Sequence, residues 1–119
     1  MAKRVLVAED DAAIRKLLVR VFAREGFDVD AASNGREAID LIGKTFYDGV
    51  VLDLMMPDIS GFDVLRWIRT ERPEIAKKLI VITAASDRET RHIRAGEVCA
   101  VLRKPFDLGE VTATLRTCV

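Results

Sequence analysis

Five polar residues stand where short apolar runs of the sequence end: Glu9, Asp10, Asp53, Thr83 and Lys104. Such runs, followed by turn-forming residues, are typical of strands that are buried on both faces. Parallel strands bring their carboxyl ends to one edge of a sheet, and open α/β sheets bind ligands at that edge. We therefore expect three carboxylates, one hydroxyl and one ammonium group to meet in a single crevice.

The chemistry of this set depends on the repulsion between its carboxylates. Two carboxylates about 4 Å apart repel each other by roughly 4 kcal/mol at an effective dielectric constant near 20. Three can stay ionised together only beside a strong cation, and an oxygen-only ligand set favours Mg²⁺ or a similar hard ion. A Mg²⁺ ion, the Lys104 ammonium and the Thr83 hydroxyl are groups that hold a transferring phosphoryl group. Asp53 is then a nucleophile that can accept this group as an acyl phosphate.

The elements that must position these residues alternate along the chain. Strands are expected over residues 4–8, 27–31, 47–53, 79–83 and 100–102. Helices are expected from Asp11 to Gly26, from Asn34 to about Ile42, from Ser60 to before Pro73, from Ser86 to near Gly96, and after Asp107. This alternation predicts a parallel sheet with helices on both faces and right-handed crossovers.

Length and composition narrow the classes of protein. A chain of 119 residues fits one domain, and its formal net charge of zero gives no signal for nucleic acid or an anionic membrane. No apolar stretch approaches a membrane span, and the N-terminal residues do not resemble a signal peptide. Cys99 and Cys118 form no metal-binding pair motif, so we interpret them as reduced thiols of a cytoplasmic protein.

The sequence resembles the receiver domains of two-component response regulators. The matching segments are residues 5–11 (Val-Leu-Val-Ala-Glu-Asp-Asp), Asn34-Gly35, residues 52–57 (Leu-Asp-Leu-Met-Met-Pro), Gly61, Thr83-Ala84 and Lys104-Pro105-Phe106. They cover essentially the whole chain in the family's order. The resemblance implies one receiver domain over residues 1–119. Its implied fold is flavodoxin-like and doubly wound, (βα)5, with a five-stranded parallel sheet in the order 2-1-3-4-5.

The resemblance also implies a role for each acidic residue of the set. Asp53 would be the phosphoacceptor. Glu9, Asp10 and Asp53, together with the backbone carbonyl of Met55, would hold Mg²⁺. Glu9 stands where an aspartate is commoner in the family, and it still supplies a carboxylate.

The remaining implied roles concern the switch between two states. Thr83 would bond a phosphoryl oxygen and move with it, and the small Ala84 would leave the phosphoryl group room. Lys104 would pair with the phosphate and form a cis bond with Pro105. Val101 stands where many members carry an aromatic residue, and the segment from Thr83 to the last strand differs in spacing from the family. A small β-branched side chain cannot replace a moving ring, so we expect weak coupling between Thr83 and the last strand.

The function implied is signalling rather than turnover of an external substrate. A sensor histidine kinase or a histidine phosphotransfer domain would pass a phosphoryl group to Asp53, which would switch an effector domain or a target protein. We expect a cytoplasmic location, homodimerisation as one option, and no contact of this domain with membrane or nucleic acid.

Three other functions are alternatives to phosphorylation-dependent signalling. A pseudo-receiver that binds partners without phosphorylation is suggested by Val101 and the altered fourth helix. A phosphate-ester hydrolase on a similar fold usually has a second acid two residues after its nucleophile, where this chain has Met55. A flavin-binding module needs glycines and hydroxyls after the first strand, where this chain has acids.

Overall fold

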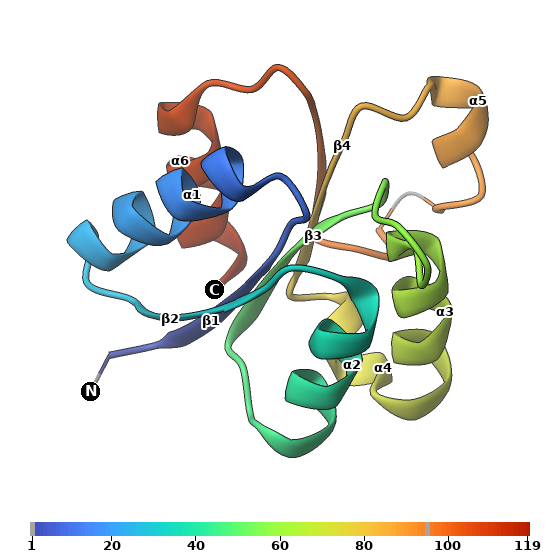
Figure 1. The fold of residues 1–119 in the computed structure, drawn as a ribbon, viewed down its shortest axis with the longest axis horizontal. Coiled ribbons are helices and arrows are strands. Elements are labelled where there is room, and N and C mark those ends of the chain that lie inside the picture. The colour runs from blue at the N-terminus through green and yellow to red at the C-terminus, as the bar shows by residue number, and fades with distance from the viewer. Residues whose placement is uncertain (1, 95) are drawn as a thin grey trace.

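The computed structural model describes residues 2–94 and 96–119, which form an α/β fold around one parallel sheet (Figure 1). Its five strands are β1 (Arg4–Ala8), β2 (Asp28–Ala32), β3 (Gly49–Asp53), β4 (Leu79–Thr83) and β5 (Ala100–Arg103). Their spatial order is β2-β1-β3-β4-β5, and every neighbouring pair is parallel. This topology confirms the predicted flavodoxin-like, doubly wound sheet.

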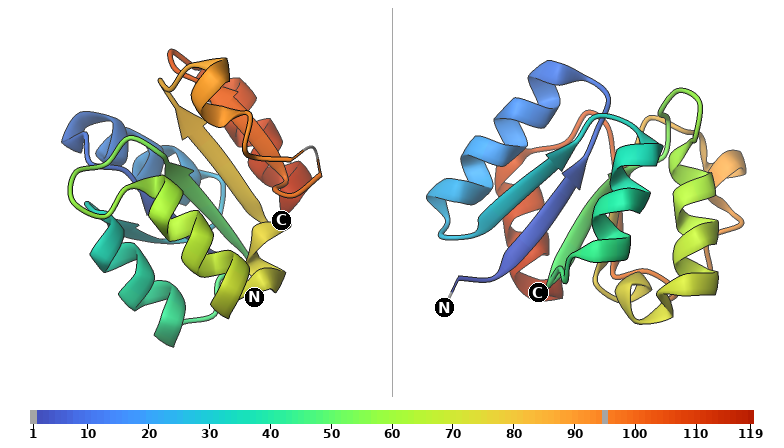
Figure 2. Two further views of the ribbon diagram at one scale, coloured as in Figure 1. Left: turned by 90° about the vertical axis from the view of Figure 1, so that its right-hand side faces the viewer. Right: turned by 60° about the horizontal axis from the view of Figure 1, so that its bottom comes forward.

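Helices cover both faces of the sheet. They are α1 (Ala12–Arg24), α2 (Gly35–Lys44), α3 (Gly61–Glu71), α4 (Pro73–Ala76), α5 (Asp87–Thr90) and α6 (Leu108–Cys118). Helices α1 and α6 lie on one face, whereas α2, α3 and α4 lie on the other (Figures 1 and 2). The short helix α5 lies beyond the carboxyl end of β4, on the side of α3.

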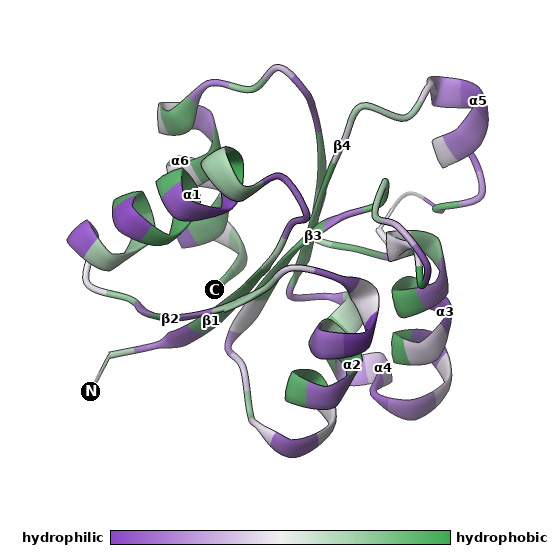
Figure 3. Ribbon diagram, in the orientation of Figure 1, coloured by the Kyte–Doolittle hydropathy of each residue, from purple (hydrophilic) through white to green (hydrophobic). Residues whose placement is uncertain are grey.

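The central strands are buried because both of their faces are covered. Every residue of β3 and β4 is buried, and successive side chains point to opposite faces. Val50 and Leu52 pack towards α2 and α3, while Val51 and Ile80 pack towards α1 and α6. The strands are accordingly hydrophobic along their length, and the helices show one hydrophobic and one hydrophilic side (Figure 3).

Side-chain caps fix where the helices begin. Asp11 accepts a hydrogen bond from the Ile14 N–H at the start of α1, and Asn34 caps α2 in the same way. Ser60 and Asp63 form a reciprocal capping box at the start of α3. These starts agree with the sequence prediction and set the loops that precede them.

Several boundaries differ from the prediction. Strand β3 begins at Gly49 rather than at residue 47, and β5 ends at Arg103 rather than at residue 102. Helix α5 ends at Thr90 rather than near Gly96, because the following backbone bonds span three residues and make turns instead of helix, as in Ile93 N–H to Thr90 O. Strand β2 starts one residue late because the Phe27 N–H still bonds a carbonyl of α1. Helix α2 continues past Gly43 to Lys44, and the additional helix α4 was not predicted.

The prediction of two reduced thiols is also wrong. Cys99 and Cys118 form a disulfide, with their Cα atoms 5.9 Å apart and a sequence separation of 19. Helix α6 runs back along the sheet to the edge where β5 begins, and this return brings its last residue to Cys99 (Figure 2). Within the described residues, no helix combines the length and the apolar character needed to cross a bilayer.

Candidate functional site

Asp53 is the buried carboxylate at the carboxyl end of β3. Its side chain is 1% exposed, and both of its oxygens have donors. The backbone N–H of Met55 donates to Oδ1 at 3.1 Å, and Lys104 Nζ donates to Oδ2 at 3.2 Å. The predicted meeting of Asp53 and Lys104 is therefore present in the structure.

Glu9 is the second buried carboxylate of the cluster. Its Oε1 lies 2.6 Å from Lys104 Nζ, and its Oε2 accepts a hydrogen bond from the Asp11 N–H at 3.2 Å. The contact with Lys104 is ionic without the angles of a hydrogen bond, so Oε1 is a buried oxygen with no hydrogen-bond partner. The Lys104 ammonium therefore compensates the charge of this oxygen as an ion pair.

Burial and mutual repulsion shape the ionisation of this cluster. Burial, and after it the nearness of Asp53, raises the pKa of Glu9 above its ordinary value, although Lys104 acts in the opposite direction. For Lys104, burial alone lowers the pKa, but Glu9 and Asp53 together raise it by more, so the ammonium stays protonated. Glu9 and Asp53 therefore share one cation, Lys104, and its single positive charge does not balance two carboxylates.

Asp10 completes an acidic cluster that is open to solvent on one side. Glu9, Asp10 and Asp53 each present a carboxylate oxygen, and these oxygens lie within 4.8 Å of one another. Asp10 is exposed, while the other two are buried. The three carboxylates form an oxygen-only donor set that fits a hard divalent cation such as Mg²⁺, approached from the exposed side at Asp10.

Arg15 holds the acidic loop in place, a role that sequence reasoning missed. From α1 its guanidinium donates to the backbone carbonyls of Glu9 and Asp10, at 2.9 and 3.3 Å. The hydrophobic spacing of the expected first helix leaves Arg15 on its polar face and gives no sign of this contact. Only the turn between β1 and α1 shows that this face looks back onto the acidic residues.

Gly61 lets the loop after β3 close tightly over Asp53. Its N–H bonds the Leu54 carbonyl at 3.0 Å, and a Cβ atom at this position would lie 2.2 Å from the Asp53 carbonyl oxygen. Asp58 forms the turn of this loop with a φ of 62°. The loop carries Met55, which is 49% exposed. The close packing of Gly61 thus fixes the backbone on which Met55 and Asp53 stand.

Thr83 and Ala84 continue the edge at the end of β4. Thr83 is fully buried, and its Oγ1 accepts a hydrogen bond from the Ala85 N–H at 2.8 Å. The hydroxyl proton remains available for another acceptor. Ala84 is exposed and brings no bulk to the edge. The bond between Lys104 and Pro105 is cis, as expected.

Arg103 connects β5 to α5, and sequence reasoning missed this residue as well. Its guanidinium bonds the Ala85 carbonyl, the Asp87 carboxylate and the Thr90 hydroxyl, the last at 2.7 Å. Val101, two residues earlier on β5, is 37% exposed. An Arg directly before the expected lysine was a visible signal, but its partners lie 13 to 18 residues away in the sequence.

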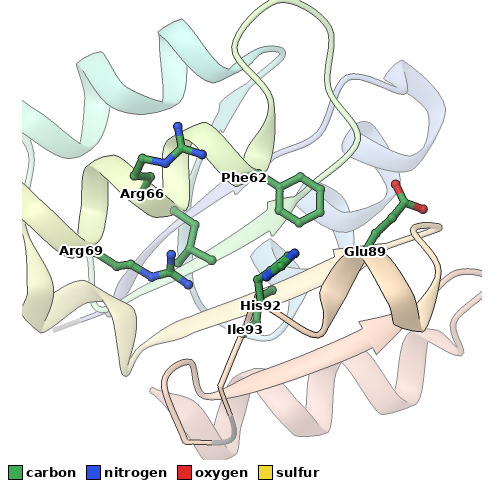
Figure 4. A pocket seen from close by; sticks show the side chains of 7 residues that line it. Phe62, Arg66, Arg69, Glu89, His92 and Ile93 are labelled. Atoms are coloured by element: carbon green, nitrogen blue, oxygen red, sulfur yellow. The ribbon is translucent and has the colours of Figure 1, made fainter.

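A second hollow lies apart from this cluster, between α3 and the segment that includes α5 (Figure 4). It is lined by Phe62, Leu65, Arg66, Arg69, Glu89, His92 and Ile93. His92 is exposed and lies in a turn after α5. The hollow is lined by apolar and basic side chains, and no buried nucleophile is among its lining residues. It is therefore suited to binding rather than to catalysis.

Comparisons with known proteins agree on one family. The family model of the response regulator receiver domain matches residues 5–116. The response regulator MprA of Mycolicibacterium vanbaalenii is 37% identical over 118 residues, which cover 98% of this chain and 50% of that protein. The chain thus spans half the length of this relative.

Solved structures give the same result. The receiver domain of the Francisella response regulator 1452 has a TM-score of 0.87 at 30% identity, covering 98% of this chain and 95% of that one. The response regulator protein TrrA from Thermotoga maritima, in complex with Mg²⁺ and BeF, has a TM-score of 0.84 at 32% identity. That match covers 98% of this chain and 99% of TrrA.

Proposed function

This chain belongs to the response regulator receiver domain family of two-component signal transduction, and we propose on that premise that Asp53 is its phosphoacceptor. A phosphoryl group would pass from a histidine nitrogen of a donor protein to an Asp53 carboxylate oxygen. The P–N bond breaks as the P–O bond of the acyl phosphate forms. The observation that carries the proposal is the buried Asp53 carboxylate held 3.2 Å from Lys104 Nζ at the edge of the sheet.

Magnesium is the cofactor in this proposal. Glu9, Asp10 and Asp53 would hold it, together with the backbone carbonyl of Met55. Bound Mg²⁺ neutralises charge on the transferring phosphoryl oxygens. Without it, those oxygens would meet three carboxylates and only the one ammonium of Lys104.

Thr83, Ala84 and Lys104 serve the phosphorylated state in this proposal. The Thr83 hydroxyl accepts from the Ala85 N–H and keeps its own proton for a phosphoryl oxygen. Lys104 would exchange part of its contact with Asp53 for the phosphate. Ala84, with its single methyl group, leaves space above the edge.

An apolar groove beside Lys104 supports docking of the phosphodonor. It is lined by Ile14 and Leu17 of α1 and by Pro105, Phe106 and Leu108. Leu17 is 42% exposed and contributes apolar surface to this groove. A sensor histidine kinase or a histidine phosphotransfer domain seated here would bring its histidine close to Asp53.

The signal would leave through partners that the domain shares with its family. We infer an effector domain or a target protein as the output and a second copy of the chain as a further partner. The domain would act in the cytoplasm as a switch, with self-phosphorylation and self-dephosphorylation rather than turnover of an external substrate.

The direct test is phosphorylation by a small acyl phosphate in the presence of Mg²⁺. Peptide mapping by mass spectrometry should find the phosphoryl group on Asp53 and nowhere else. Asp53→Asn should abolish the modification, while Asp58→Asn, an exposed acid in the same loop, should leave it unchanged. Equal phosphorylation of Asp53→Asn and the wild type would refute the proposal.

A phosphorylation-independent interaction module is the second candidate. It is favoured by Val101 in place of an aromatic residue and by the four-residue α5. The same experiment separates the two candidates, because a pseudo-receiver would stay unmodified under conditions that phosphorylate a working receiver.

A further inference from the structure

The Cys99–Cys118 disulfide joins two elements at the edge of the sheet opposite the acidic cluster. Cys99 directly precedes β5, and its N–H bonds the Leu79 carbonyl at the start of β4 at 2.9 Å. Cys118 is the last residue of α6. Because the strands are parallel, this is the amino edge of the sheet, whereas Asp53 lies at the carboxyl edge.

The covalent ring closed by this bond contains the candidate switch residues of the last strand. It runs from Cys99 through β5, passes Lys104 at the opposite edge, and returns along α6. Only the four residues of β5 separate Cys99 from Lys104. We call residues 99–118 the β5–α6 unit. A bond at one end of this unit limits how far β5 and α6 can move relative to each other.

The fold around the disulfide is complete without it. Strand β5 is hydrogen-bonded to β4 along its length, and α6 is anchored by the fully buried Val111 and Leu115. These contacts belong to the core shared with α1, against which Cys118 also packs. Opening the bond should therefore loosen one unit and leave the domain folded.

Both cysteines are accessible to solvent, which favours exchange of their disulfide with thiols. Cys99 is exposed and Cys118 is partly exposed, so an attacking thiolate can reach the bond from solvent. Disulfides buried in a core lack this access. In the cytoplasm, where we propose that this domain acts, disulfides are usually transient and catalytic or redox-sensing rather than structural.

We propose that Cys99 and Cys118 form a reversible thiol–disulfide modification site, whose redox state sets the rigidity of the β5–α6 unit. In reduction, a small thiolate attacks the Cys99 sulfur, the S–S bond breaks, and the Cys118 thiolate leaves and takes up a proton. A second thiol resolves the mixed disulfide. The balance is one protein disulfide plus two thiols giving one protein dithiol plus one small disulfide, and oxidation by a small disulfide is the reverse.

The test titrates the pair with glutathione buffers that span reduced to oxidised ratios. Thiol counting after denaturation should move from two to none, and the far-ultraviolet circular dichroism should stay unchanged throughout. Reduction should lower the melting temperature by about 10 °C, because a bond that closes a loop of this length restricts the unfolded chain. Amide exchange should become faster in residues 100–118 and not in β1 or β3.

Two serine variants serve as controls. Cys99→Ser and Cys118→Ser should match the reduced wild type in melting temperature, and oxidised glutathione should add at most one mixed disulfide to the remaining thiol without raising that temperature. The reduced wild type itself supplies the comparison if a variant folds poorly. The proposal fails if two thiols persist in excess oxidised glutathione, if only dimers linked between chains form, or if reduction requires unfolding. Thiol state is read without phosphorylation, so this result is independent of the role of Asp53.

Discussion

Arg103 Nη2 donates a hydrogen bond to Thr90 Oγ1 at 2.7 Å, joining the last residue of β5 to the last residue of α5. The same guanidinium bonds the Ala85 carbonyl and the Asp87 carboxylate. One side chain therefore contacts three residues of the segment from Ala85 to Thr90. Because Arg103 directly precedes Lys104, this segment is tied to the residue that contacts the candidate phosphoacceptor.

Removing the Arg103 guanidinium should loosen α5 more than it destabilises the domain. Helix α5 is four residues long, too short to persist on its own propensity. In Arg103→Ala we expect amide exchange in residues 86–90 to rise about tenfold. The free energy of unfolding should fall by about 1 kcal/mol, since the guanidinium is partly exposed. Arg88→Ala, an exposed residue of the same helix, is the control and should change neither quantity.

The response to phosphorylation should stay close to Asp53. Val101 is stiff at its first side-chain torsion and too small to move a ring between solvent and core. Arg103 in addition holds α5 in place. Chemical-shift mapping with Mg²⁺ and beryllofluoride should therefore give small changes over residues 86–102. Changes over residues 88–93 and at Val101 as large as those near Asp53 would contradict this expectation.

The signals that predicted polar residues at one edge of the sheet are local. The end of each buried strand and the caps at Asn34 and Ser60 depend on neighbouring residues, and they agree with the structure. The strand order followed from the resemblance to a family with a known topology, and the sheet confirms it.

The missed features all depend on contacts between distant parts of the chain. Arg15 bonds the acidic loop only because α1 folds back over the end of β1. The disulfide forms only because α6 returns to the edge where β5 begins, so the two cysteines gave no signal as a spaced motif. The length of α5 was misjudged because the chain must turn after Thr90 to reach β5.

Magnesium affinity should depend on pH through Glu9. Its raised pKa means that a proton competes with the cation at a higher pH than for an ordinary carboxyl group. As pH falls through that raised pKa, Mg²⁺ binding should weaken by up to about tenfold per pH unit, and it should recover as pH rises. Calorimetric titration at several pH values measures this dependence.

A neutral isostere at this position provides the check. Glu9→Gln should bind Mg²⁺ about tenfold more weakly and lose most of the pH dependence that lies above the ordinary titration range of a carboxyl group. Glu71→Gln, an exposed acid at the end of α3, should behave like the wild type. An unchanged pH profile in Glu9→Gln would show that another group controls the binding of the cation.

Two glycine substitutions should have opposite effects on stability. A Cβ at Gly61 would lie 2.2 Å from the Asp53 carbonyl oxygen and 2.4 Å from the Leu54 Cα, and neither backbone atom can move aside cheaply. Gly61→Ala should therefore cost about 1–3 kcal/mol of unfolding free energy. It should also weaken Mg²⁺ binding, because the loop that carries Met55 must shift.

At Gly43, inside α2, a Cβ would meet only the Trp67 ring at 3.9 Å. Gly43→Ala should stabilise the domain by about 0.5–1 kcal/mol and leave Mg²⁺ affinity unchanged. Urea unfolding and metal titration of both variants decide the matter, and equal stability of Gly61→Ala and the wild type would mean that the loop over Asp53 is not held as tightly as its backbone contacts indicate.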